Sequence, residues 1–185
     1  MSRVCDCFPE LKGITEARER RYLMDPEKPA PEGPQSFVEV KVTSIGQLNE
    51  VVECKKSGYK FLISEPVHVG GQNCAPSPLE FLLAGAVGCY AAVFAFYAAK
   101  LGVSYEKFEA TAHADFDVRG HMMEAAPSSA FRKVTISIAL ASDAPEGTLK
   151  EIERLALQGC PGVSTLRNPV PIETALKITR TARAA

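Results

Sequence analysis

An uncharged run from Phe81 to Ala99 constrains the fold of this chain more than any other feature. A helix over this run is apolar on every side, and such a helix belongs either at the centre of a core or in a bilayer. The run is rich in Ala and Gly, ends at Lys100-Leu101-Gly102, and has no second apolar span beside it. We therefore expect a buried central helix and not a membrane span.

The start of this helix is marked by a capping pattern. Ser77 can act as the N-cap, Pro78 suits the first turn, and Glu80 occupies the position three residues after the cap. The predicted helix then carries Cys89 near its middle.

Alternation of apolar and polar residues predicts strands both before and after the central helix in the sequence. These strands fall within residues 37–63 (three short antiparallel ones), 108–118, 134–140 and 170–178. A capping box over Asp143-Ala144-Pro145-Glu146 is expected to start a second helix, which ends at Gly159. The element order predicts an α+β architecture with helices packed against an antiparallel sheet.

Residues 1–36 differ from the rest of the chain. Four prolines stand between Pro26 and Pro34, which predicts a stiff tether, and Pro9 to Leu23 can form a short amphipathic helix before it. We expect an N-terminal extension over 1–36 and one domain over 37–185. The formal net charge of −1 disfavours nucleic acid and anionic membranes as partners, and without a secretory signal pattern the expected location is the cytoplasm.

Two cysteines stand in contexts that suit thiol chemistry. Cys160 lies between Gly159, a helix terminator, and Pro161, a first-turn residue, so a short helix over 161–166 can start at the thiol. Helix N–H groups would favour the thiolate and lower the pKa of Cys160. The alternative interpretation is a small apolar residue at a helix junction.

Cys89 is predicted to lie in mid-helix, where it needs a nearby cation or hydrogen-bond donor for activation, and it can equally be a packing residue. Small residues around it, from Ala84 to Gly88, let another backbone or a ligand approach the sulfur. The pair Cys5 and Cys7 has no second pair at metal-ligand spacing, so no metal site is expected. Cys54 and Cys74 are interpreted as packing residues.

Ser77-Pro78-Leu79-Glu80-Phe81-Leu82-Leu83-Ala84 followed by Gly88-Cys89, with Gly159-Cys160-Pro161 and Leu166-Arg167-Asn168-Pro169-Val170 further on, resembles a known family. The chain is similar over about residues 37–181 to the osmotically inducible protein C and organic hydroperoxide resistance (OsmC/Ohr) superfamily. The resemblance implies an intertwined homodimer with two central helices in its core and two active sites at its interface.

The resemblance also implies a chemistry. Cys89 would be the peroxidatic thiolate that attacks an organic hydroperoxide, Cys160 the resolving thiol, and a lipoyl or thioredoxin-like dithiol the reductant, with no cofactor. Glu80 would correspond to the glutamate that braces the activating arginine in peroxidase members.

This chain departs from the peroxidase pattern at that arginine. No arginine stands between Phe37 and Cys89, Gln47 occupies the region where it is expected, and the glutamate comes one residue late, behind Leu79. The chain is in this respect similar to a Ser-Pro-x-Glu branch of the family, in which Glu80 can simply cap its helix. Other cations available to replace the missing charge are Arg20, Arg21, Arg119, Arg132 and Arg167.

Two functions are therefore open at the level of sequence. One is thiol-dependent reduction of organic hydroperoxides through Cys89 and Cys160. The alternative is a non-catalytic OsmC-like protein that binds a small apolar or electrophilic ligand at the dimer interface.

Overall fold

The structure, a computed structural model, describes residues 36–121 and 127–179. The predicted helix within residues 9–23 and the Pro-rich tether lie outside the described residues. The elements are β1 (Val40–Gly46), β2 (Asn49–Cys54), β3 (Lys60–Ser64), the 3-10 turn η2 (Val67–Val69), α2 (Pro78–Lys100), β4 (Lys107–Asp115), the 3-10 turn η3 (Val118–His121), β5 (Lys133–Ala141), α3 (Glu146–Gly159) and α4 (Pro161–Arg167).

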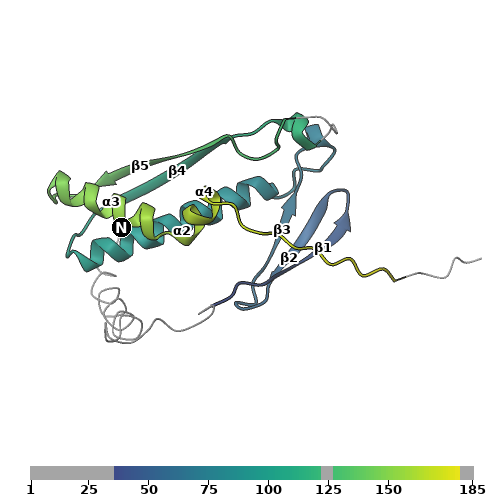
Figure 1. Ribbon diagram of the computed structural model, residues 1–185, viewed down its shortest axis with the longest axis horizontal. Helices are drawn as coiled ribbons and strands as arrows, with labels where there is room; N and C mark the ends of the chain where they lie inside the picture. The colour runs from purple at the N-terminus through teal and green to yellow at the C-terminus, as the bar shows by residue number, and fades with distance from the viewer. Residues whose placement is uncertain (1–35, 122–126, 180–185) are drawn as a thin grey trace, which may run out of the picture.

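The strands form two antiparallel sheets, one in the order β1-β2-β3 and one a β4-β5 pair. Figure 1 shows β4 and β5 running along the central helix α2, with the three-stranded sheet set off from the helices. Phe61 of β3 stacks on Phe81 in the first turn of α2, with ring centroids 4.6 Å apart. The expected α+β architecture with antiparallel strands and a long central helix is confirmed.

The central helix begins where the sequence predicts. The Ser77 hydroxyl oxygen accepts a hydrogen bond from the Glu80 N–H, and the Glu80 carboxylate accepts one from the Ser77 N–H at 2.7 Å. The two backbone N–H groups would otherwise have no partner at the start of a helix. This reciprocal pair of hydrogen bonds therefore fixes where the first turn begins.

The core lies between α2 and the elements that follow it. Its fully buried members come from three helices and include Tyr90, Phe94, Ala98, Ile152, Ala156 and Cys160. Burial of each large apolar side chain contributes about 1.5 to 3 kcal/mol. By length and composition α2 could cross a membrane, but one of its faces packs against α3, α4 and β4. Leu79 and Leu82 on α2 remain exposed, so one chain does not bury the whole circumference of the helix.

Two predicted details are wrong. The capping box at Asp143 does not form, because Pro145 occupies the N-cap of α3 and its carbonyl accepts the N–H groups of Thr148 and Leu149 directly. The final strand is absent from the described residues: 168–179 form no strand, and Ile172 and Leu176 are 86% and 88% exposed. An isolated segment has no partner for its backbone groups, so alternation alone does not make a strand.

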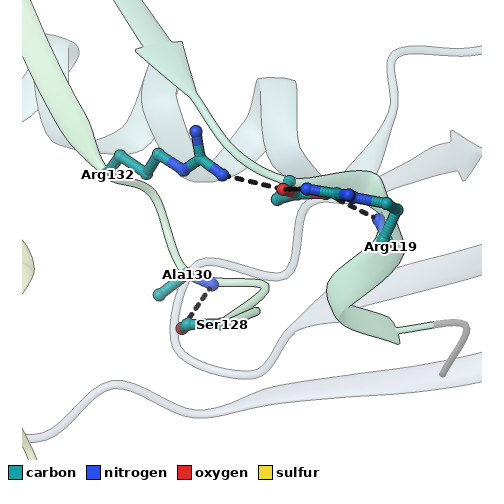
Figure 2. Close-up of polar contacts among 5 residues, drawn as sticks. Arg119, Ser128, Ala130 and Arg132 are labelled. Atoms are coloured by element: carbon teal, nitrogen blue, oxygen red, sulfur yellow. Dashed lines mark hydrogen bonds and ion pairs between the residues drawn. The ribbon is translucent and has the colours of Figure 1, made fainter. Parts of the chain in front are cut away.

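A two-arginine clamp closes the long connection between β4 and β5. The guanidinium groups of Arg119 and Arg132 each lie 2.7 Å from Oδ2 of Asp117, and Figure 2 shows the two arginine side chains converging from opposite ends of the connection. The Asp117 side chain is only 9% exposed. Hydrogen bonds from Arg119, and then the charges of both arginines, hold the pKa of Asp117 well below its ordinary value.

This depressed pKa predicts an acid-sensitive contribution to stability. A carboxylate whose pKa is lower in the folded state stabilises the fold above its ordinary pKa and loses that contribution as the pH falls toward the folded value. We expect Asp117→Asn to lower the urea midpoint at neutral pH and to weaken the fall of that midpoint below about pH 4. The control Glu146→Gln, in an exposed pair with Lys150, should change little. An unchanged pH profile in Asp117→Asn would contradict the clamp.

The short helix α4 packs against α2 at unusually close range. A Cβ placed on Gly162 would meet Cα of Ala86 at 3.1 Å and Cβ of Cys89 at 3.2 Å. Any side chain at this position would force the first turn of α4 and the backbone of α2 apart by a few tenths of an ångström. The approach predicted from the small residues before Cys89 therefore occurs, and the approaching backbone belongs to α4.

Gly162→Ala should push α4 away from α2. We expect a loss of about 1 to 3 kcal/mol in the free energy of unfolding, measured by urea titration, because an added methyl overfills a packed contact. Gly147→Ala is the matched control, since a Cβ at Gly147 meets nothing within 4 Å. That control should keep or raise stability, and equal stability of the two variants would argue against the close contact.

Candidate functional site

The structure brings together the two cysteines that the sequence singled out, although they are 71 positions apart in the chain (160 minus 89). Cys89 lies midway along α2, and Cys160 is the N-cap of α4. The contact at Gly162 brings the first turn of α4 against Cys89, and the Cys89 thiol is close enough to raise the pKa of Cys160. Both are free thiols in the structure, so they form a facing dithiol.

The environment of Cys160 differs from the sequence prediction. The helix does start at Pro161, and the Val163 N–H donates a hydrogen bond to the Cys160 sulfur at 3.4 Å. Burial nevertheless dominates: Cys160 is 0% exposed, and desolvation of the charged form raises its pKa. The Cys89 thiol raises it further, while the N–H groups of Val163 and Gly162 oppose the shift. The predicted lowering of this pKa is therefore wrong.

The two thiols differ in their access to solvent. In the single chain Cys89 is partly exposed, whereas Cys160 is fully buried. A molecule arriving from outside therefore meets Cys89 first. This asymmetry suits a pair in which one thiol reacts and the other traps the product.

Glu80 is not brought to the thiols within the chain. It lies in the first turn of α2, nine positions before Cys89, which is about 13.5 Å along a helix axis. Its carboxylate is exposed and engaged with Ser77, and the backbone N–H of Ser77 lowers the pKa of Glu80. Within one chain Glu80 caps a helix.

No arginine in the described ranges, 36–121 and 127–179, donates a hydrogen bond to Cys89. Arg119 and Arg132 are held by Asp117, and Arg167 ends α4. Gln47 lies in the tight β1–β2 turn, where its φ is 55°. The remaining candidates, Arg20 and Arg21, lie outside the described residues.

The remaining described cysteines stand apart from this pair. The Cys74 thiol donates a hydrogen bond to Oδ1 of Asn49 at 3.4 Å, in the loop before α2, and Cys54 ends β2. Across the described residues no three His, Cys, Asp or Glu side chains are grouped in a way that could hold a metal ion. Cys5 and Cys7 lie outside that part of the chain.

Sequence reasoning missed two residues of the site, Tyr90 and Gly162. A signal existed for Gly162, because a glycine inside a short helix weakens the helix and so indicates a close approach of another backbone. Tyr90 follows Cys89 directly and is 0% exposed. Nothing in the local pattern distinguishes it from the other aromatic residues of the apolar run.

A family model described as OsmC-like protein matches residues 70–175, which is more than half of the chain and includes both thiols. None of the curated protein sequences is significantly similar to this chain.

Solved structures share the fold at low sequence identity. An OsmC-like protein from Mycoplasma pneumoniae is 15% identical with a TM-score of 0.63, covering 72% of this chain and 89% of its own. An OsmC-like protein of unknown function from Vibrio cholerae is 19% identical with a TM-score of 0.59, covering 71% and 94%. An organic hydroperoxide resistance protein from Legionella pneumophila is 19% identical with a TM-score of 0.52, covering 73% and 92%. On the match of its residues 70–175, the chain belongs to the OsmC-like protein family.

Proposed function

We propose that this protein reduces organic hydroperoxides through the facing thiols of Cys89 and Cys160. The observation that carries the proposal is their asymmetric pairing, with a partly exposed thiol beside a fully buried one. The Legionella pneumophila structure described as an organic hydroperoxide resistance protein shares the fold and supports this choice of substrate.

In the first step the Cys89 thiolate attacks the distal oxygen of the hydroperoxide. The O–O bond breaks, the sulfur is oxidised to a sulfenic acid, and the departing alkoxide takes a proton to become an alcohol. Cys160 then attacks the Cys89 sulfur, a disulfide forms, and the sulfenic oxygen leaves as water with the proton from Cys160. A second thiol this close traps the sulfenic acid before further oxidation.

An external dithiol, lipoyl or thioredoxin-like, returns the disulfide to two thiols. In that exchange a thiolate of the reductant attacks the protein disulfide and forms a mixed disulfide with the protein. The second thiol of the reductant then attacks this mixed disulfide, which frees the protein thiol and leaves the reductant as an internal disulfide. Cys89 is the point of attack, because Cys160 is buried. We place the protein in the cytoplasm, where such reductants keep thiols reduced, with neither nucleic acid nor membrane as a partner.

The proposed assembly is an intertwined homodimer. The single chain exposes apolar side chains on β1, on α2 and on the segment after α4, and monomeric proteins rarely expose such extended apolar surface. These side chains are Val40, Val42, Leu79, Leu82, Ile172 and Leu176. A second copy would cover them and would give residues 168–179 the strand partner that they lack in one chain.

A second function has an observation in its favour. Among the described residues no guanidinium pairs with Cys89, and Glu80 is engaged as a helix cap. A protein of this kind could bind a small apolar or electrophilic molecule at the dimer interface, with the cysteines as the wall of its pocket. Turnover separates the two functions, because binding alone consumes no peroxide.

The peroxidase proposal predicts distinct defects for the two cysteines. With cumene hydroperoxide and dihydrolipoamide, we expect Cys89→Ser to abolish peroxide consumption. When the dithiol is left out, Cys160→Ser should accumulate a sulfenic acid on Cys89 that dimedone traps, because no second thiol is present to resolve it. Mass spectrometry of the parent after peroxide should show a Cys89–Cys160 disulfide.

Cys54→Ser is the control for the loss of a thiol as such, since Cys54 lies at the end of β2, away from the pair. It should retain full turnover. Absence of turnover and of the disulfide in the parent, with any of several dithiols, would reject the peroxidase and leave the binding function.

The dimer predicts a mass of twice 20.0 kDa by sedimentation equilibrium at micromolar concentration. Leu176→Lys should shift the protein toward monomer, because it places a charge on the apolar side of the final segment. Ala175→Lys adds the same charge to the opposite side and is the matched control. A parent protein that sediments as a monomer would contradict the assembly.

A further inference from the structure

Cys89 and Cys160 border the same turn of backbone at the start of α4. On one side of this turn, a Cβ on Gly162 would lie 3.2 Å from Cβ of Cys89. On the other side, the Cys160 sulfur accepts a hydrogen bond from the N–H of Val163, the next residue, at 3.4 Å. Cys89 also packs against the buried cluster that contains Cys160 and Val163. Packing contacts alone therefore make the two thiols neighbours.

The pair offers two sulfur ligands and no further ones. In the part of the chain that the structure describes, no three His, Cys, Asp or Glu side chains are grouped so that they could hold a metal ion. Zinc takes four protein ligands in structural sites and three in catalytic sites, so two sulfurs do not make a zinc site. The pair suits a ligand atom that needs two sulfurs and brings its remaining substituent with it.

Burial favours a ligand that leaves the site without charge. Cys160 is 0% exposed, and burial raises the pKa of Cys160, so this sulfur is a neutral thiol. A metal cation binds thiolates and must first displace their protons, and burying a charge without a partner is costly. A ligand that exchanges two hydroxyl groups for two neutral thiols gives a neutral product. Such a product needs no cation beside it, and no described arginine is a hydrogen-bond partner of Cys89.

We propose that Cys89 and Cys160 together bind a trivalent arsenical that carries one organic group, through two S–As bonds. The hydrated arsenical has two As–OH groups, and each thiol displaces one of them. An S–As bond forms, an As–O bond breaks, and the thiol proton leaves with the hydroxyl as water. Arsenic stays trivalent, so the step needs neither an oxidant nor a reductant. The inference goes beyond the proposed function, because it rests on the pairing of the thiols and not on peroxide turnover.

The different exposure of the two thiols gives the order of the steps. Cys89 is partly exposed in the single chain, so the first S–As bond forms there and Cys160 closes the second. A disulfide brings two sulfurs to about 2.05 Å, whereas an arsenic atom between them spans a wider gap and demands less movement of α4. On α2 a Cβ at Gly85 or Gly88 would meet nothing within 4 Å, which leaves room beside Cys89 for the organic group.

Phenylarsine oxide is the probe for this site. The background is the full chain, reduced, with Cys5 and Cys7 replaced by serine, because that closely spaced pair would also bind arsenic. We expect native mass spectrometry to show one phenylarsenic group per chain, which excess glutathione does not remove and dimercaptopropanol does. Cys89→Ser should weaken this binding by at least about a hundredfold, because the gain from joining two bonds in one site is lost.

Two controls separate the pair from thiols in general. Cys54→Ser and Cys74→Ser should keep the affinity of the background, since Cys54 ends β2 and Cys74 bonds to Asn49 in the loop before α2. Cys160→Ala removes the second sulfur and keeps a small apolar side chain in the core, so it should lose the arsenical as Cys89→Ser does. A urea transition checks that each variant is folded, and Cys89→Ser decides the test if Cys160→Ala is not.

Equal binding by the background protein and by Cys89→Ser would overturn the inference. Removal of the phenylarsenic group from the background protein by glutathione would also overturn it, because a single S–As bond exchanges with a monothiol. The assay contains no peroxide. Absence of peroxide turnover therefore rejects the proposed function and leaves this inference standing, whereas loss of arsenical binding with turnover intact rejects this inference alone.

Discussion

The close contact between α4 and α2 at Gly162 is the constraint on which the rest of the site depends. A side chain at that position would meet the backbone of Ala86 and the side chain of Cys89 at 3.1 to 3.2 Å. Without this approach Cys160 would start its helix at a distance from Cys89, and the two thiols would have no common chemistry. The small residues on α2 and the glycine on α4 together allow the two helices to pack this closely.

Cys160 illustrates a competition between two physical effects. Its position at a helix start, with the Val163 N–H on the sulfur, favours the thiolate. Complete burial favours the neutral thiol, and burial is the larger effect. The outcome fits the proposed division of roles, because a resolving thiol that stays protonated does not compete with Cys89 for the oxidant, and ionisation is needed only after Cys89 has reacted.

The exposed apolar side of α2 and the missing final strand can be explained in the same way, by a partner that the single chain lacks. The exposed side of α2 carries Leu79 and Leu82, and the segment after α4 carries Ile172 and Leu176. Sequence periodicity identifies apolar faces, but it does not say whether the partner lies in the same chain. The proposed dimer accounts for both features, since a second copy can cover a helix face and pair with an extended segment.

The sequence by itself determined much of the local structure and singled out the two cysteines that the fold brings together. Capping at Ser77, alternation in β4 and β5, and Pro161 after Cys160 are local patterns, so the elements and their starts could be predicted. Local rules failed where a competing group intervened, as the Pro145 carbonyl did in place of the Asp143 capping box. Only the tertiary structure decided the burial of Cys160 and the contact at Gly162, because each depends on which distant segments share a core.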